Sequence, residues 1–199
     1  MDALDLAWPR VASTPLKTLA TNSGATLESK GRVLRLKIID RECLIDLDSR
    51  EIKYVTPRPA IVDSHIQVLV LHYLMGAGNA QLVNRFVTFR EFEGGALYYS
   101  AFKARAIDTL VTEFGEKPDI LRHIGDAIKA EPLDKGDVAF KLNFFPKMPV
   151  GVLLWVGDEE VPTSANMLFD VNAGKVLPTE DISVVGGATS RRLIEISRR

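Results

Sequence analysis

The 199-residue chain contains one cysteine, Cys43. A single cysteine excludes an intramolecular disulfide, and it excludes an iron–sulfur cluster or a cysteine-type zinc site built within this chain, because such sites need several thiolates. The alternating pattern around Cys43 predicts that it points inward from a strand. A buried thiol acts as a small apolar side chain, so we do not expect a nucleophile there. The sequence identifies no cofactor.

Neither sign of charge is in excess. The 25 Lys and Arg residues nearly balance the 26 Asp and Glu residues, which leaves a net charge of −1. Proteins that bind nucleic acid neutralise phosphates with surplus Lys and Arg. We therefore expect no nucleic-acid partner.

Long hydrophobic runs are missing as well. The longest apolar stretch, Ile66 to Met75, is interrupted by Gln67 and His72. It is about half the length that a membrane-spanning helix needs. The amino-terminal residues show no basic segment followed by an apolar one, which is the pattern of a signal peptide. The sequence predicts a soluble, cytoplasmic protein without a membrane partner; the partner expected instead is a protein or small molecule of unknown identity.

Motifs of the common enzyme classes are absent. The chain has no Gly-x-Ser-x-Gly, no Walker loop and no His-Glu-x-x-His. The glycines of residues 75–80 follow a predicted helix and lack the third glycine of a dinucleotide loop. His65 and His72 would lie about 10 Å apart along one helix, which is too far for one metal ion.

Hydrophobic periodicity predicts an α+β fold in a single domain over residues 1–199. Alternation over residues 32–55 predicts an antiparallel meander, and residues 138–156 predict a hairpin. The apolar run within that hairpin, residues 150–156, is continuous. It predicts a central strand in which Leu153 and Trp155 are largely buried.

Helices are expected to pack against these strands. Pro9 and Pro15 should divide the amino-terminal segment into short helices. The other predicted helices are residues 61–75, a helix that ends near Phe114, one that begins at Pro118, a short one over residues 163–169, and a final one over residues 181–197.

Six carboxylates near the carboxyl-terminal strands form the first candidate site. Asp158, Glu159 and Glu160 follow a predicted buried strand, where functional loops are often found. We expect the loop of residues 157–162 to lie near the turn of residues 177–181. The six carboxylates are Asp158, Glu159, Glu160, Asp170, Glu180 and Asp181.

Such a cluster has several interpretations. Carboxylates can bind Mg²⁺ or Ca²⁺, with Asp158 and Glu160 as the candidate ligands, or one of them can act as a general base. Arg90 or Arg105 should approach at least one of the acids, because a neutral protein has to compensate gathered negative charge. Alternatively, the acids only form a turn after Gly157 and place negative charge at the start of the last helix.

A second candidate site surrounds the glycine pair Gly94 and Gly95. Backbone N–H groups at the start of a helix can bind an anion, and neighbouring arginines would add positive charge. The side chains considered for this site are Arg90, Glu91, Tyr98, Tyr99, Lys103 and Arg105. The alternative is that the glycines only make a turn.

A series of short segments runs in order along residues 72–196. The segments are His72-Tyr73-Leu74, residues 88–92 with Gly94, Gly95, Tyr99 and Phe102, Phe114-Gly115, residues 136–140, 145–149, 155–162, 168–170 and 177–181. This series resembles DUF3786, a bacterial and archaeal domain of unknown function. The resemblance implies a setting in anaerobic redox or one-carbon metabolism, and it brings no established catalytic residues.

Three hypotheses about function follow. The first is a non-catalytic accessory protein that binds a ligand or a partner. The second is a metal-assisted hydrolase that uses the carboxylates, and the third is a structural protein whose exposed aromatic surface is an oligomer interface. Whether the carboxylates converge in one cleft or lie apart distinguishes the first two hypotheses.

Overall fold

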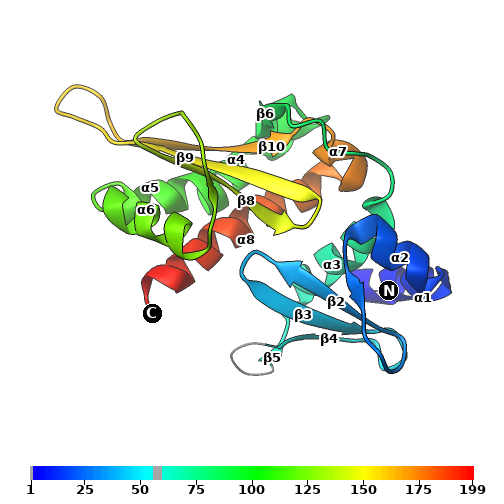
Figure 1. Ribbon diagram of the computed structural model, residues 1–199. Helices are drawn as coiled ribbons and strands as arrows, with labels where there is room; N and C mark the ends of the chain where they lie inside the picture. Colours follow the sequence, from blue (N-terminus) through cyan, green and yellow to red (C-terminus); the bar gives the residue numbers. More distant parts are fainter. Residues whose placement is uncertain (1, 56–59) are drawn as a thin grey trace.

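The computed structural model describes residues 2–55 and 60–199 (Figure 1). The amino-terminal part contains an antiparallel five-stranded sheet in the order β1-β2-β3-β4-β5. Its elements are α1 (Ala3–Ser13), α2 (Leu16–Ser23), β1 (Thr26–Leu27), β2 (Val33–Ile38), β3 (Arg41–Asp46), β4 (Glu51–Tyr54), β5 (Ala60–Ile61) and α3 (Ser64–Gly76). The predicted meander is confirmed.

The carboxyl-terminal part contains a second antiparallel five-stranded sheet, in the order β6-β10-β9-β8-β7. Its strands are β6 (Phe86–Thr88), β7 (Glu131–Pro132), β8 (Val138–Phe145), β9 (Met148–Trp155) and β10 (Ser164–Asp170). The helices are α4 (Gly95–Phe102), α5 (Asp108–Phe114), α6 (Pro118–Ala127), α7 (Ala173–Val176) and α8 (Thr179–Ser197). The α+β class is confirmed.

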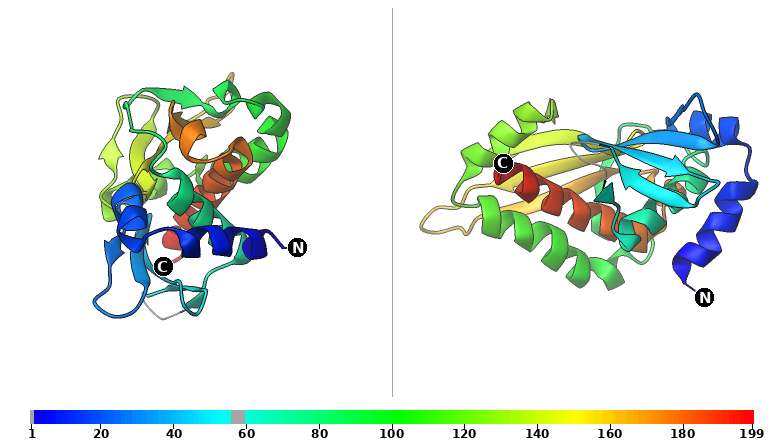
Figure 2. Two further views of the ribbon diagram at one scale, coloured as in Figure 1. Left: turned by 90° about the vertical axis from the view of Figure 1, so that its right-hand side faces the viewer. Right: turned by 90° about the horizontal axis from the view of Figure 1, so that it is seen from below.

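Helices α5, α6 and α8 lie against one face of this second sheet, as the view from below shows (Figure 2). A 3₁₀ turn, η1 (Phe89–Glu91), precedes α4, and a π-helical turn, η2 (Lys103–Ile107), joins α4 directly to α5. None of the helices among the described residues is long and apolar enough to cross a membrane.

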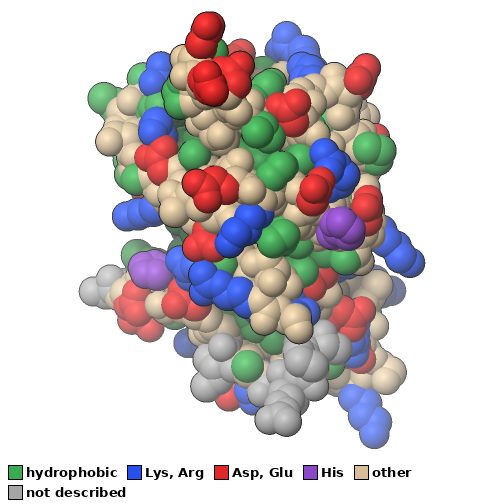
Figure 3. All heavy atoms as spheres, turned by 90° about the vertical axis from the view of Figure 1, so that its left-hand side faces the viewer, with side chains coloured by type: hydrophobic (Ala, Val, Ile, Leu, Met, Phe, Trp, Pro, Cys, Tyr) green, Lys and Arg blue, Asp and Glu red, His purple; other side chains and the backbone are tan. Residues whose placement is uncertain are grey.

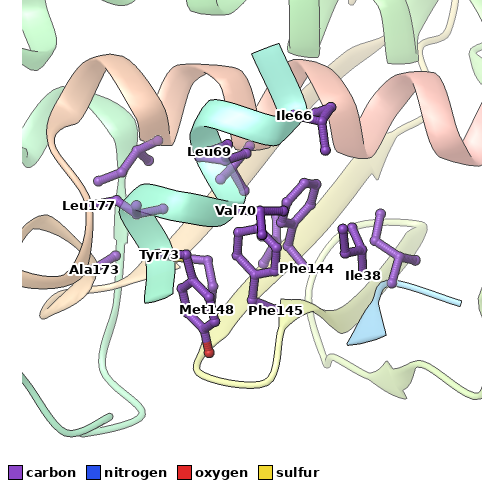
Figure 4. Packing of buried hydrophobic residues seen from close by; sticks show 14 of the residues in the cluster. Ile38, Ile66, Leu69, Val70, Tyr73, Phe144, Phe145, Met148, Ala173 and Leu177 are labelled. Atoms are coloured by element: carbon purple, nitrogen blue, oxygen red, sulfur yellow. The ribbon is translucent and has the colours of Figure 1, made fainter. Parts of the chain in front are cut away.

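The core joins both sheets through α3. Figure 4 shows Val70 and Tyr73 of α3 beside Phe144 and Phe145 of β8. The rings of Tyr73 and Phe145 stack with centroids 4.2 Å apart. The buried Tyr73 hydroxyl donates to the carbonyl oxygen of Ser23 at 2.7 Å. One cluster of buried side chains thus includes residues from both sheets. A shared core supports the prediction that the chain forms a single domain.

Several predictions about individual elements are wrong. Residues 163–169 were expected to form a helix, but Ser164–Asp170 is strand β10, because this segment pairs with β9 on one side and β6 on the other. Pro9 lies inside α1 and does not end a helix. Helix α3 begins at Ser64, because Ala60–Ile61 pairs with β4 as a short strand.

The central position of β9 is confirmed, since β8 and β10 pair with its two sides. Leu153 is buried as predicted, with 2% of its surface exposed. The burial predicted for Trp155 is wrong, because 38% of this residue is exposed. Trp155 is the last residue of β9 and pairs with Ser164, the first residue of β10. It therefore lies at the end of the sheet.

Cys43 has no exposed surface, and burial raises the pKa of its thiol to about 12. We expect Cys43→Ala to fold normally and to lose about 1–2 kcal/mol of unfolding free energy, because it leaves only a small cavity. Urea unfolding measures this loss. A thiol reagent should modify the parent protein quickly only in urea. Fast labelling of the native protein would show that the thiol is reactive.

Candidate functional site

The first acidic signature builds its own loop between β9 and β10. The backbone N–H of Asp158 donates to the carbonyl oxygen of Val161 at 2.9 Å. The Asp158 carboxylate accepts from the N–H groups of Val161 and Glu160, at 2.8 and 2.9 Å. These bonds, with that from Val161 the largest, lower the pKa of Asp158. Asp158 therefore shapes the loop, while the side chains of Glu159 and Glu160 remain exposed.

The second acidic signature lies elsewhere. Glu180 and Asp181 are in the first turn of α8, which follows the end of β10. The loop of residues 157–162 precedes the start of β10, so a strand about 20 Å long separates the two signatures along the chain. The prediction that they lie near each other is wrong, because it did not anticipate that strand.

Asp170 has a structural environment of its own. It is fully buried at the end of β10. Its carboxylate accepts from the backbone N–H groups of Val83, Asn84 and Asn172, at 3.1, 2.8 and 2.9 Å. The residue fixes the segment before β6 against the end of β10, and its oxygens are already hydrogen-bonded. The six carboxylates therefore lie in three separate places.

The start of α8 is tied to two other helices. His72 of α3 and Asp181 lie 2.6 Å apart, Nδ1 to Oδ2, and the hydroxyl of Tyr98 donates to Glu180. Burial raises the pKa of Asp181, and the hydrogen bond with His72 opposes that effect. Only 14% of the Asp181 side chain is exposed, against 38% for His72. The pair links α3 to α8.

The residues around Gly94 and Gly95 also bond locally. The guanidinium of Arg90 lies over the ring of Tyr99, 3.7 Å from its centroid. Glu91 accepts from the backbone N–H and the hydroxyl of Thr88, at 2.7 and 3.1 Å, and so caps η1.

The compensation predicted for the acids is wrong. Within residues 2–55 and 60–199, neither Arg90 nor Arg105 forms an ion pair with a carboxylate. The physical reason is that Asp158 accepts from backbone N–H groups and Asp181 pairs with His72, while Glu159 and Glu160 are exposed to solvent.

A groove of about 710 Å³ runs along α8. One wall is the start of α3, the opposite wall is η2 with the start of α5, and α8 forms the floor between them. We call this the α8 groove, and the residues of it used below are His65, Ile66, Arg105, Val184, Gly187, Arg191 and Ile194. Its volume is in the range of small-molecule sites, and π-helical turns often occur at functional sites.

Arginines dominate the charge of the α8 groove. Arg105 on η2 packs close to α8, because a Cβ at Gly187 would lie only 3.4 Å from the Cβ of Arg105. Arg191 follows Gly187 by one helical turn and so projects from the same face of α8. Arg198, further along α8, also lines the groove but pairs with Glu113 at 3.2 Å.

The two carboxylates of the groove are committed to other partners. Asp63 accepts from the backbone N–H of His65 at 3.0 Å. Glu195 accepts from Arg41 and Arg192, both at 2.8 Å. In the part of the chain that the structure describes, Arg105 and Arg191 have no ion-pair partner. The groove therefore carries these two arginines, one on η2 and one on α8, together with the carboxylate of Asp63.

A second cavity of about 280 Å³ continues the groove toward the turn between β2 and β3. It shares Ile66, Arg191 and Glu195 with the α8 groove and adds Arg41 and Arg192. Among the described residues, Nε of Arg41 is a buried polar atom without a hydrogen-bond partner. Lys and Arg side chains gather in a band across the middle of the face in Figure 3.

Sequence reasoning selected Arg105 but missed its neighbours His65 and Arg191. A signal was present, because residues 184, 187, 188, 191, 194 and 198 follow the spacing of one helical face and combine small, apolar and basic side chains. It also missed His72 and Tyr98 as partners of the acids. No group of three or more His, Cys, Asp or Glu side chains suited to a metal ion occurs among the residues that the structure describes.

Comparison with known proteins was made for the whole chain. Neither the curated proteins nor the solved structures gave a match. The family model described as "Domain of unknown function (DUF3786)" matches residues 15–192, which confirms the resemblance and extends it to the amino-terminal part. The chain belongs to the DUF3786 family.

Proposed function

We propose that the protein is a non-catalytic binding protein, and that its α8 groove holds an anionic group of a ligand or partner. The observation that carries this proposal is the pair Arg105 and Arg191, which line a groove of about 710 Å³ without ion-pair partners among the described residues. A bound anion would be attracted to both guanidinium groups.

The chemistry of the groove favours an anion with an apolar portion. Guanidinium groups bind carboxylates and phosphates through two parallel hydrogen bonds. Ile66, Val184 and Ile194 line the same groove and offer apolar surface beside the arginines. A ligand of this class would be oriented by its charge and held by contact with these side chains.

The positions of the carboxylates support binding over hydrolysis. A metal-assisted hydrolase needs several oxygen ligands around one ion. Asp158 bonds its own loop, Asp170 is buried under backbone N–H groups, and Asp181 pairs with His72. This arrangement gives the hydrolase hypothesis no shared site. A cytoplasmic location belongs to the proposal, and so does a role beside anaerobic redox or one-carbon enzymes, which rests on the family resemblance.

Titration calorimetry with pyrophosphate and with citrate at low ionic strength tests the proposal. We expect Arg105→Gln and Arg191→Gln each to weaken binding about five- to tenfold, because each removes a charge-assisted hydrogen bond worth about 1–1.4 kcal/mol at an exposed site. Added salt should weaken binding by the parent protein.

Arg122→Gln is the matched control, because Arg122 is an exposed arginine on α6 that does not line the α8 groove. It should bind both anions like the parent. Equal losses in all three variants would contradict the proposal. Absence of binding in the parent would contradict it for free anions and leave only an anionic group of a protein partner.

A further inference from the structure

Apolar side chains are exposed where β9 runs into the loop before β10. Trp155, Val156 and Val161 have 38%, 43% and 60% of their surface exposed. The loop projects beyond the rest of the sheet (Figure 1). We call residues 155–163 the projecting loop. Exposed apolar side chains gathered at one place are typical of a surface that contacts a partner.

The projecting loop is held in one shape by its own hydrogen bonds. The carboxylate of Asp158 accepts from two backbone N–H groups, and the hydroxyl of Thr163 accepts from the N–H of Gly157 at 2.9 Å. A loop that is already ordered loses little conformational entropy when it binds. Its shape is therefore suited to insertion into a preformed groove.

The charges of the projecting loop and the α8 groove are complementary. Glu159 and Glu160 are exposed beside the apolar side chains of the loop. Arg105 and Arg191 lie beside apolar side chains in the groove. Each surface thus combines apolar contact area with a pair of charges, and the two pairs have opposite sign. Such complementarity selects partners and fixes their orientation.

Both surfaces belong to one side of the molecule. Figure 3 shows carboxylates at the top of that side, where Figure 1 places the projecting loop, and the band of Lys and Arg side chains below them. The carboxyl-terminal half of α8 ends on the same side (Figure 1). A two-fold axis can therefore bring each loop to the groove of the other copy, which closes the assembly as a dimer.

We infer that the partner of the α8 groove is a second copy of this chain, whose projecting loop occupies it. In this dimer Glu159 and Glu160 of each copy meet Arg105 and Arg191 of the other, and Val161 contacts the apolar part of the groove. The inference rests on the proposed function, since it assigns the partner of the same anion-binding groove.

Charge-reversed variants of the full chain test the dimer by sedimentation velocity and light scattering. We expect the parent protein to be a dimer that dissociates at high salt. The variants Glu159→Lys/Glu160→Lys and Arg105→Glu/Arg191→Glu should each be monomeric, because like charges then face each other. An equimolar mixture of the two variants should form dimers, since every loop then finds a groove of opposite charge.

Two further proteins control for folding and for general effects of charge. A chain that carries all four reversals should dimerise again. Asp2→Lys/Asp5→Lys changes the charge by the same amount at the start of α1, away from both surfaces, and should stay dimeric. A monomeric parent, or a mixture of the two variants that stays monomeric while both are folded, would overturn the dimer.

The two proposals fail differently. The loop variant Glu159→Lys/Glu160→Lys keeps an intact groove, so pyrophosphate should bind to it at least as tightly as to the parent. Pyrophosphate binding to this variant together with a monomeric parent would overturn the dimer and leave the proposed function standing. If the parent forms the expected dimer but the loop variant binds neither pyrophosphate nor citrate, the α8 groove binds only the projecting loop of the second copy.

Discussion

Gly76→Ala is expected to destabilise the protein by about 3 kcal/mol or more. Gly76 is the last residue of α3, and a Cβ atom there would lie 1.9 Å from the carbonyl oxygen of Val176 at the end of α7. The obstacle is backbone, so no side-chain rotation relieves the overlap. Helices α3 and α7 would have to move apart, and the core around Tyr73 would lose contacts.

Urea unfolding followed by far-ultraviolet circular dichroism measures the effect of Gly76→Ala. Gly187→Ala is the matched control, because it is the same substitution in a helix, with its nearest neighbour, the Cβ of Arg105, at an ordinary 3.4 Å. For Gly187→Ala we expect the unfolding free energy to rise by up to about 1 kcal/mol, because alanine has the higher helix propensity. Equal unfolding midpoints for the parent and Gly76→Ala would show that the two helices separate easily.

Arg192→Met is expected to lower the unfolding free energy by about 3–5 kcal/mol. The Arg192 side chain is 7% exposed and binds both oxygens of Asp40, at 2.7 and 2.5 Å, and Glu195 at 2.8 Å. The bonds to Asp40 connect α8 to the turn between β2 and β3. Removal of the arginine leaves the Asp40 carboxylate partly buried without its main partner. Asp40→Asn in the same chain should recover part of the loss, because the unpaired charge is then gone.

Acid should reduce the difference in unfolding free energy between the parent and Arg192→Met. Burial alone would raise the pKa of Asp40, but the hydrogen bond and the charge of Arg192 outweigh it and hold that pKa below its ordinary value of 3.8. A carboxyl whose pKa is lowered by folding stabilises the folded state above its unfolded pKa, and the contribution disappears as the pH falls through the folded value. The parent therefore loses this contribution in acid, and the variant has none to lose.

Unfolding free energies of the parent and Arg192→Met, measured at neutral pH and at about pH 3, show whether the difference between them becomes smaller in acid. Arg122→Met is the control, because its ion pair with Asp119 is exposed and should be worth less than about 1 kcal/mol at either pH. A loss for Arg192→Met no larger than that of the control would contradict the structural role assigned to Arg192.

The strands were predictable where side chains alternate between a buried and an exposed face. Cys43 and Ile45 of β3 are buried, as the period of two requires. A continuous apolar run, such as residues 150–156, does not tell where a strand extends beyond the buried part of the sheet, and this is why the exposure of Trp155 was missed. Residues 164–170 contain good helix formers such as Ala165, Met167 and Leu168, and pairing with two neighbouring strands overrode that preference.

The candidate site was less predictable than the fold. Sequence spacing placed the acids after buried segments but could not tell at which end of β10 each group would lie. The α8 groove forms from Arg105 and Arg191, which are far apart in the sequence and meet only because η2 packs on α8. Local sequence patterns do not show that two distant residues will line the same groove. The spacing of residues along α8 indicated only the face of α8 that forms the floor of the groove.

The π-helical turn η2 sets which faces of α4 and α5 point to the core. A π turn holds one residue more than an α turn in the same helix. If all of these residues formed one regular α-helix, the part after η2 would be rotated by about 100° relative to α4. Phe102 and Leu110, which are both fully buried, could then not face the core together. The π turn thus accommodates one additional residue while both buried positions still face the core, and Arg105, which packs over α8, belongs to this turn.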